Sequence, residues 1–367
     1  MLRYQLSTPQ IHSRHLPSIQ HVLFFSYLIF LRKLIKNDFK LKMKTSSRRK
    51  FLFNSLALTS FPFLSSGIHG CAFQKNKLEL ALQIYSFAPL LFQNKLDVLM
   101  FPQMIKENYG INAAEYWSIA FMGKEKDKSF IKELQTRSKD YDIDNLIILV
   151  DNIDLKTMEN GPSLASSEKV ERDQSLSFHK YWIDTASEIG CHSIRVNLRS
   201  DESDDNKVLD NSSESISKLI EHSKGQGVSI VVENHGGITG DADWLVRLMN
   251  NINSDFVGTL PDFGSYNFCV ERGDLDFEGL TSKCKNQYDK YIGVKKLMPF
   301  AKGVSAKSHQ FNSSGEETST DFSKMMDIIS SSSYEGFITI EYEGAMMKMF
   351  GGKGDYLEPH DGVKVTK

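Results

Sequence analysis

The stretch Gly227–Gly237, GVSIVVENHGG, decides the fold class. Its residues 229–232 are mostly apolar and β-branched, which is typical of a strand buried on both faces of a parallel sheet. The stretch then turns abruptly polar at Glu233, Asn234 and His235, and two glycines follow that let the backbone turn away. Parallel α/β sheets and barrels build their sites from side chains at this end of a strand.

The chain repeats this pattern from Leu78 onward, with a short apolar strand, a polar turn and an amphipathic helix. The predicted strands are Leu80–Tyr85, Ala113–Trp117, Asn145–Val150, Ser193–Leu198, Ser229–Glu233, Val257–Asp262, Gly303–His309 and Phe337–Glu341. The predicted helices are Ser129–Asp140, Ser166–Ile189, Ser213–Gly225, Asp241–Asn251, Leu275–Lys296 and Asp321–Ser331. Strands that alternate with helices indicate a parallel sheet, and eight units in about 290 residues match a (β/α)8 TIM barrel.

The predicted barrel occupies residues 78–345, and residues 346–367 are interpreted as a C-terminal tail without periodicity at its end. A doubly wound open sheet is the alternative fold, but no glycine-rich phosphate loop follows the first strand. The polar segments 200–215 and 312–320 are predicted as solvated loops on the catalytic face of the barrel.

Composition excludes several classes of protein. The 367 residues are 40% hydrophobic and 25% charged, with a formal net charge of −2, as in an ordinary globular protein. A nucleic-acid binder needs a basic excess that is missing here, so no nucleic-acid partner is predicted. The four cysteines have neither a metal-binding spacing nor the density of a disulfide scaffold.

The N-terminal residues predict export. Residues 1–42 are basic and aromatic, and we interpret them as an upstream extension before a true start at Met43. Residues 43–71 have a charged region with an arginine pair, an apolar stretch and a small-residue end, which resembles a twin-arginine signal. Cys71 ends a segment that resembles a lipoprotein cleavage box, which predicts lipidation there and a periplasmic or membrane-anchored product. An uncleaved membrane anchor is the alternative.

Four predicted strands end in residues that bind metals. Glu233, Asp262, His309 and Glu341 end the fifth to eighth strands, so all four are expected at one mouth of the barrel. Three carboxylates and one imidazole suit one divalent ion such as Mn²⁺, Mg²⁺, Co²⁺ or Zn²⁺. A lone acid or histidine at a strand end is more often a helix cap or a surface residue. Four such strand ends together favour a shared metal site.

The segment from about Leu78 to Tyr342 resembles the xylose isomerase-like TIM-barrel superfamily, the sugar phosphate isomerase/epimerase group. The resemblance is carried by VVENHGG (231–237), LPDFGS (260–265), SAKSHQF (305–311) and ITIEYEG (338–344). It implies that Glu233, Asp262, His309 and Glu341 hold one divalent metal ion against a carbohydrate substrate. It also implies that Glu233 and Glu341 lie on opposite faces of the sugar and act as the acid/base pair of an isomerase or epimerase.

The chain departs from the ketose 3-epimerases of this group at two positions. Their histidine three residues after the aspartate is Ser265 here, and the arginine they place after the histidine ligand is missing. Lys307, His235 and Asn234 are therefore the candidate substrate-binding residues. Substrate binding is not the only interpretation of these residues. Lys307 could equally extend to solvent at the strand end, and His235 could equally have a capping role. Three polar residues on earlier strands either line the pocket or belong to the internal packing of the barrel: Gln83, Glu115 and Arg195.

Three other functions compete with isomerisation. An endonuclease IV-like trinuclear zinc site would need further histidines, which the second and third strand ends lack. A lyase or hydrolase acting on 3-keto glycosides could use the same metal and base to remove an α-proton and then eliminate the leaving group. An exported, non-catalytic carbohydrate-binding lipoprotein is the third alternative, although the presence of both Glu233 and Glu341 argues against it. Whether the chain forms a homo-oligomer stays open.

Overall fold

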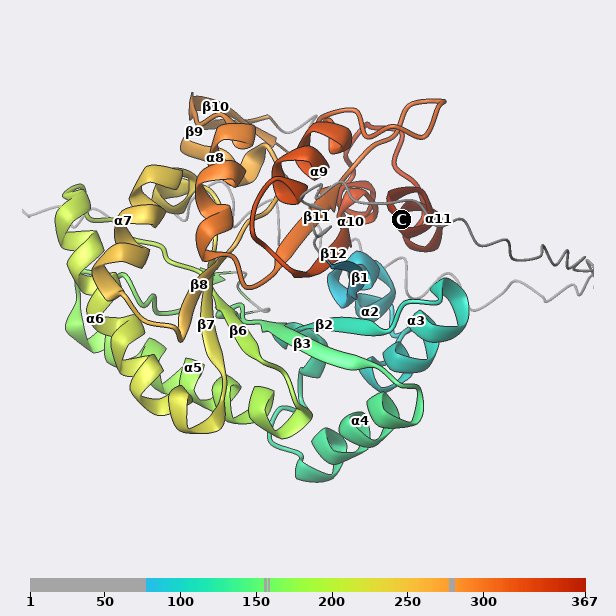
Figure 1. Ribbon diagram of the computed structural model, residues 1–367, viewed down its shortest axis with the longest axis horizontal. Helices are drawn as coiled ribbons and strands as arrows, with labels where there is room; N and C mark the ends of the chain where they lie inside the picture. Colours follow the sequence, from blue (N-terminus) through green and yellow to red (C-terminus); the bar gives the residue numbers. More distant parts are fainter. Residues whose placement is uncertain (1–76, 155–156, 158, 277–280) are drawn as a thin grey trace, which may run out of the picture. The chain divides into compact units, whose positions relative to one another are not determined.

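A closed barrel forms the larger of two compact units in the computed structural model, which describes residues 77–154, 157, 159–276 and 281–367. Within these described residues, one 8-stranded parallel sheet has the order β11-β12-β1-β2-β3-β6-β7-β8 (Figure 1). Its strands are β1 (Leu78–Gln83), β2 (Ala113–Trp117), β3 (Asp144–Leu149), β6 (Ser193–Val196), β7 (Ser229–Glu233), β8 (Val257–Leu260), β11 (Val304–Ser308) and β12 (Gly336–Tyr342). Parallel bridges from Thr259 to Ala301 and from Asp262 to Ser305 join the two ends of this order. The predicted TIM-barrel fold is confirmed.

A helix follows each barrel strand and covers the outer face of the sheet (Figure 1). These helices are α3 (Phe101–Tyr109), α4 (Lys128–Asp140), α5 (Lys169–Ile189), α6 (Asp205–Ser223), α7 (Ala242–Ile252), α8 (Lys290–Leu297), α9 (Phe322–Ser330) and α11 (Pro359–Thr366). Shorter helices are α2 (Ala88–Phe92) and α10 (Gly344–Met349). Aspartates cap α4, α6, α7, α8 and α9, because each accepts hydrogen bonds from N–H groups of the first turn.

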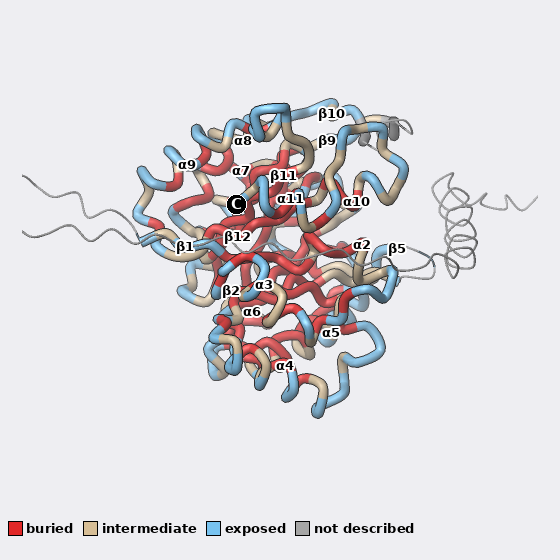
Figure 2. The backbone as a smooth tube through the Cα atoms, turned by 90° about the vertical axis from the view of Figure 1, so that its right-hand side faces the viewer, coloured by how far each residue is buried: buried red, intermediate tan, exposed pale blue. Residues whose placement is uncertain are grey.

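The barrel strands are the most buried part of this unit, as Figure 2 shows along the backbone. All residues of β2 and β11 are buried, because side chains on one strand face fill the barrel and those on the other pack under the helices. The inner face is polar toward the carboxyl ends of the strands. It carries Glu115, Glu233, Lys307 and Glu341, each at most 4% exposed. A buried polar layer of this kind requires partners inside the barrel.

The polar segment 200–215 is mostly a helix, so its predicted loop is wrong beyond Ser203. Helix α6 begins at Asp205, with the Asp204 carboxylate accepting from the N–H of Asn206. Val208 and Ser212 on its inner side are buried. Few apolar residues mark this first half of α6, which hid its amphipathic pattern. The segment 312–320 has no helix or strand, as predicted.

The predicted helix Leu275–Lys296 is also wrong over most of its length. An antiparallel hairpin stands there instead, formed by β9 (Cys269–Asp276) and β10 (Thr281–Gln287), and only the last part is helical, as α8. A disulfide between Cys269 and Cys284 joins the two strands. This pairing was not predicted from the sequence. The cysteines are 15 residues apart, and only the hairpin brings them together.

The last residues supply the eighth helix of the barrel. In α11, Val363 is fully buried and Gly362 lies so close to the Tyr342 ring that a Cβ at this glycine would be 2.1 Å from it. The Thr366 and Ser308 hydroxyl groups lie 2.7 Å apart, which ties α11 to the end of β11. The part of the chain after residue 346 is therefore a packed element of the barrel and not only a tail.

Several predictions concern residues outside the described ranges. These are the upstream extension 1–42, the export signal 43–71 and the lipidation of Cys71. The second compact unit includes a two-stranded hairpin of β4 (Ile153–Asp154) and β5 (Glu159–Asn160). Among the described helices, none has the length and apolar character needed to cross a bilayer.

Candidate metal centre

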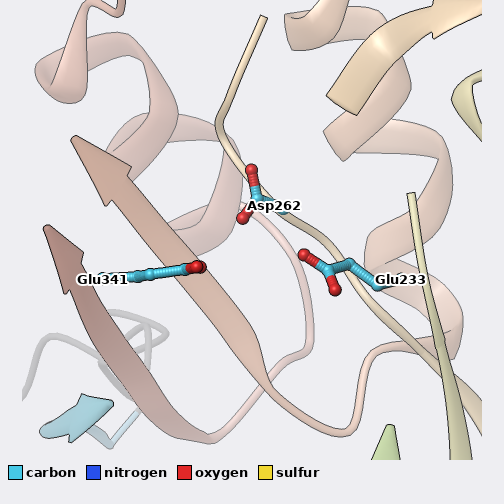
Figure 3. A group of neighbouring side chains, drawn as sticks. All are labelled: Glu233, Asp262 and Glu341. Atoms are coloured by element: carbon cyan, nitrogen blue, oxygen red, sulfur yellow. The ribbon is translucent and has the colours of Figure 1, made fainter. Parts of the chain in front are cut away.

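Three buried carboxylates converge at the mouth of the barrel, where the carboxyl ends of the strands meet. Glu233 ends β7, Asp262 follows β8 by two residues, and Glu341 is the next-to-last residue of β12. One oxygen from each lies within 4.8 Å of the other two (Figure 3). Figure 3 also shows that Glu233 and Glu341 approach from opposite sides, with Asp262 between them. Among the described residues, His309 does not join this group.

The backbone of Asp262 is held by Asn234. The Asn234 amide donates to the carbonyl oxygen of Asp262 at 3.1 Å, and its oxygen accepts from the N–H of Asp262 at 2.8 Å. The Asp262 Oδ1 accepts from the N–H of Gly264 at 2.6 Å. A Cβ at Gly264 would lie 2.9 Å from this oxygen, so the turn requires glycine. Asn234, predicted to bind substrate, is thus placed as a fully buried positioning residue.

Glu233 is held by a network that crosses β3, β6 and β7. The Arg195 Nε lies 2.9 Å from Glu233 Oε2, and Arg195 Nη1 donates to Asp151 at 2.6 Å. Asp151 also accepts from Trp117 Nε1 at 2.7 Å and from Asn197 at 2.8 Å. The Arg195 N–H is not aimed at Oε2, which leaves this oxygen without a hydrogen bond from any described residue.

Glu341 and Asp262 share one ammonium group. The Lys307 Nζ lies 3.3 Å from Glu341 Oε1, 3.5 Å from Asp262 Oδ2 and 3.4 Å from Glu343 Oε2. Ser305, two residues earlier on β11 and therefore on the same face, donates to Glu341 Oε2 at 2.6 Å. Burial alone would lower the pKa of Lys307, but Asp262, Glu341 and Glu343 raise it well above its usual value. Lys307 is therefore a permanent cation.

His309 pairs with Glu343 and not with the three converging carboxylates. Its Nε2 lies 3.2 Å from Glu343 Oε2, and Tyr85 donates to Glu343 Oε1 at 3.4 Å. Both side chains of the His309–Glu343 pair are about a quarter exposed. Although burial would raise the pKa of Glu343, Lys307 and His309 hold it well below its usual range. His309 follows the end of β11, where the chain leaves the barrel register that aims Ser305 and Lys307 inward.

His235 lies at the rim of the mouth with an exposed side chain. Its backbone N–H donates to Thr239 Oγ1 at 3.0 Å, and its carbonyl accepts from Arg272 at 3.2 Å. Arg272 comes from the β9–β10 hairpin and stacks over the Tyr266 ring, 3.9 Å from its centre. The His235 ring is thus available to a ligand at this edge.

Glu115 lies deeper in the barrel. It accepts from Thr339 Oγ1 at 2.7 Å and from Gln83 Nε2 at 3.3 Å, and it is fully buried. Burial raises its pKa from 4.5 to about 8, because these two hydrogen bonds only partly offset the loss of solvation. Glu115 is therefore largely neutral at pH 7.

The comparisons with known proteins can be set against this geometry. The family model described as xylose isomerase-like TIM barrel matches residues 106–361. The chain belongs to this family. No significant relative is found among curated protein sequences.

Solved structures of similar fold cover most of this xylose isomerase-like barrel. An AP endonuclease, family 2, from Brucella melitensis is 14% identical, with a TM-score of 0.52 over 78% of this chain and 96% of that one. An L-ribulose 3-epimerase is 12% identical, with a TM-score of 0.55 over 79% and 92%. The IOLI protein with a bound zinc atom is 12% identical, with a TM-score of 0.52 over 78% and 95%. At such identities the likeness shows the fold.

The donor set of this xylose isomerase-like barrel fits a divalent cation. Within the described residues, Glu233 Oε2 and Asp262 Oδ2 are buried without a hydrogen-bond partner. Burial raises the pKa of Glu233 to about 7 and that of Asp262 well above its usual value, despite the nearby cations. Five acidic side chains surround only two cations, Arg195 and Lys307, so a divalent ion here would favour the ionised form of the buried acids. Hard divalent ions take such oxygen ligands.

Sequence reasoning missed several residues of the site. Ser305 and Glu343 were not singled out, although each lies two residues from a predicted site residue, Lys307 and Glu341 respectively. That spacing was the available signal. Asp151 directly follows the predicted strand Asn145–Val150, which was its signal, but only the fold brings it to Arg195.

Proposed function

We propose that this chain is a sugar isomerase or epimerase that removes a proton next to a carbonyl group. The convergence of Glu233, Asp262 and Glu341 at the mouth of a xylose isomerase-like barrel carries this proposal. The structural likeness to an L-ribulose 3-epimerase supports the reaction class.

Glu233, Asp262 and Glu341 would hold the divalent ion. When bound, the ion supplies a Lewis acid for the substrate carbonyl oxygen, since a proton α to a carbonyl is only weakly acidic. The zinc atom named for the IOLI protein supports a metal in this fold. The predicted fourth ligand, His309, faces Glu343 instead, so we assign the ion three carboxylates from this chain.

Glu233 and Glu341 act as the acid/base pair. They approach the centre from opposite sides, so one can remove a proton from one face of a carbon while the other returns a proton to the opposite face (Figure 3). That exchange inverts the carbon. Without the ion, burial raises the pKa of Glu233 to about 7. Arg195 and Asp151 hold the Glu233 carboxylate in place.

Metal content and product mass test the proposed reaction together. We expect the chain from about Ala72 onward, without signal and lipid, to carry about one divalent ion and to convert a ketose into a product of equal mass. Elemental analysis and chromatography with mass detection measure both. Release of an aglycone or second sugar from a 3-keto glycoside would instead establish elimination. A chain that takes up no Mn²⁺, Co²⁺ or Zn²⁺ and turns over neither substrate class would leave only carbohydrate binding.

We further propose that the chain is exported and lipid-anchored. The Cys269–Cys284 disulfide supports export, because structural disulfides persist mainly in oxidising compartments.

Fractionation and peptide mapping test export and anchoring. We expect the native chain in the membrane fraction, with Cys71 as the first residue and a lipid on its thiol. A C71A variant should appear in the soluble fraction, with the Cys269–Cys284 peptides still linked. A native peptide from upstream of Met43, or free thiols at both cysteines, would contradict this.

A further inference from the structure

The position of the Lys307 ammonium has a consequence for metal binding. It contacts oxygens of Asp262 and Glu341, which are two of the three proposed metal ligands, at 3.5 Å and 3.3 Å. Lys307 is 4% exposed, so bulk water screens its charge only weakly, and the charge acts strongly at close range. An ammonium group and a divalent ion both seek these same oxygens.

The third contact of Lys307 lies outside the proposed ligand set. Glu343 Oε2 is 3.4 Å from the ammonium, and Glu343 belongs to the partly exposed pair with His309. The flexible four-carbon stem of a lysine lets its ammonium move between neighbouring partners. Glu343 is therefore a place to which Lys307 can withdraw while keeping a counter-ion.

We propose that Lys307 and the divalent ion exchange at Asp262 and Glu341, with metal entry displacing the ammonium onto Glu343. The inference rests on the proposed metal centre and adds a regulation to it. Without the ion, Lys307 neutralises part of the buried negative charge. With the ion, Lys307 lies beside Glu343 at the edge of the substrate site.

A double-mutant cycle measured by calorimetric Mn²⁺ titration of the mature chain tests the exchange. K307M should bind Mn²⁺ at least about tenfold more tightly, because a competing cation is lost. E343Q should weaken binding about tenfold, because displaced Lys307 has no counter-ion. In the K307M background the same E343Q change should cost less than about threefold. K307Q repeats K307M with a side chain that still hydrogen-bonds, and the exposed K132M is the matched control.

The outcomes separate this inference from the proposed function. Equal losses from E343Q in both backgrounds would mean that Glu343 only attracts the ion electrostatically, without exchange. Unchanged affinity in both K307M and K307Q would mean no competition. Either result overturns the exchange while leaving the metal centre intact. If neither the wild type nor any Lys307 variant binds Mn²⁺, the metal centre itself is wrong and the exchange fails with it.

Discussion

The E341Q variant is expected to lose the proposed isomerase activity by about 10³-fold, because one substitution removes both a proposed proton-transfer group and a proposed metal ligand. Glutamine keeps the shape of the side chain and can still accept from Ser305, whose hydroxyl lies 2.6 Å from the Glu341 carboxylate. The loss should therefore come from charge and proton transfer rather than from misfolding. Steady-state kinetics and Mn²⁺ titration measure the two effects separately, and metal affinity should fall at least about tenfold.

Two further variants make the E341Q result specific. E335Q carries the same change at an exposed position just before β12 and should match the wild type in both measurements. H309A should reduce Mn²⁺ affinity far less than E341Q, because the His309 ring contacts Glu343 and not the proposed ligands. Equal losses of metal in H309A and E341Q would restore His309 as a ligand. Full activity in E341Q would exclude the proposed acid/base pair.

The E115Q variant is expected to stabilise the chain at alkaline pH. The folded-state pKa of Glu115 is raised from 4.5 to about 8, so the folded state binds a proton that the unfolded state has lost between these values. Stability from this group is present at pH 4 and declines as pH rises to about 8. A buried amide never ionises, so E115Q should exceed the wild type at pH 8.5 by about 2–4 kcal/mol. The side-chain amide that E115Q introduces can donate to Gln83 Oε1, which lacks a hydrogen-bond partner among the described residues.

Denaturant unfolding at pH 5.5 and pH 8.5 measures this difference. The gap between the two chains should be small at pH 5.5, only about one unit above the unfolded-state pKa, and should widen by pH 8.5, where the folded wild type also ionises. E335Q again supplies the exposed control, with no expected pH-dependent difference. A gap of the same size at both pH values would show a packing effect and not the ionisation of Glu115.

The strands were the predictable part of the fold. Strands such as β7 and β11 are short segments that end in or run into polar residues, and this local pattern survives in the structure because both faces of a parallel sheet are buried. It also placed Glu233, Asp262 and Glu341 at one edge. The positions of α11 and the β9–β10 hairpin were not predictable in the same way. Helix α11 packs on Tyr342, which is distant in sequence, and a disulfide joins the two strands of the hairpin.

The direction in which each side chain points could not be predicted from the sequence. Lys307 and His309 are two residues apart, which predicts a common face, yet Lys307 points among the carboxylates and His309 turns to Glu343. The difference arises because β11 ends at Ser308 and the strand geometry ends with it. Partners such as Asp151 and Arg195 come from separate strands, so only the closed barrel defines their contact.

Pairing of β1 with β12 also sets when this molecule can fold. The ribosome makes β1 near the start of the barrel and β12 almost at its end, with Leu78 paired to Gly336. Until synthesis passes residue 342, the growing polypeptide has an open arc of strands with two unpaired edges, which are the surfaces that aggregate most readily. Closure and the last helix then come together. The barrel can therefore close only when β12 is available to pair with β1.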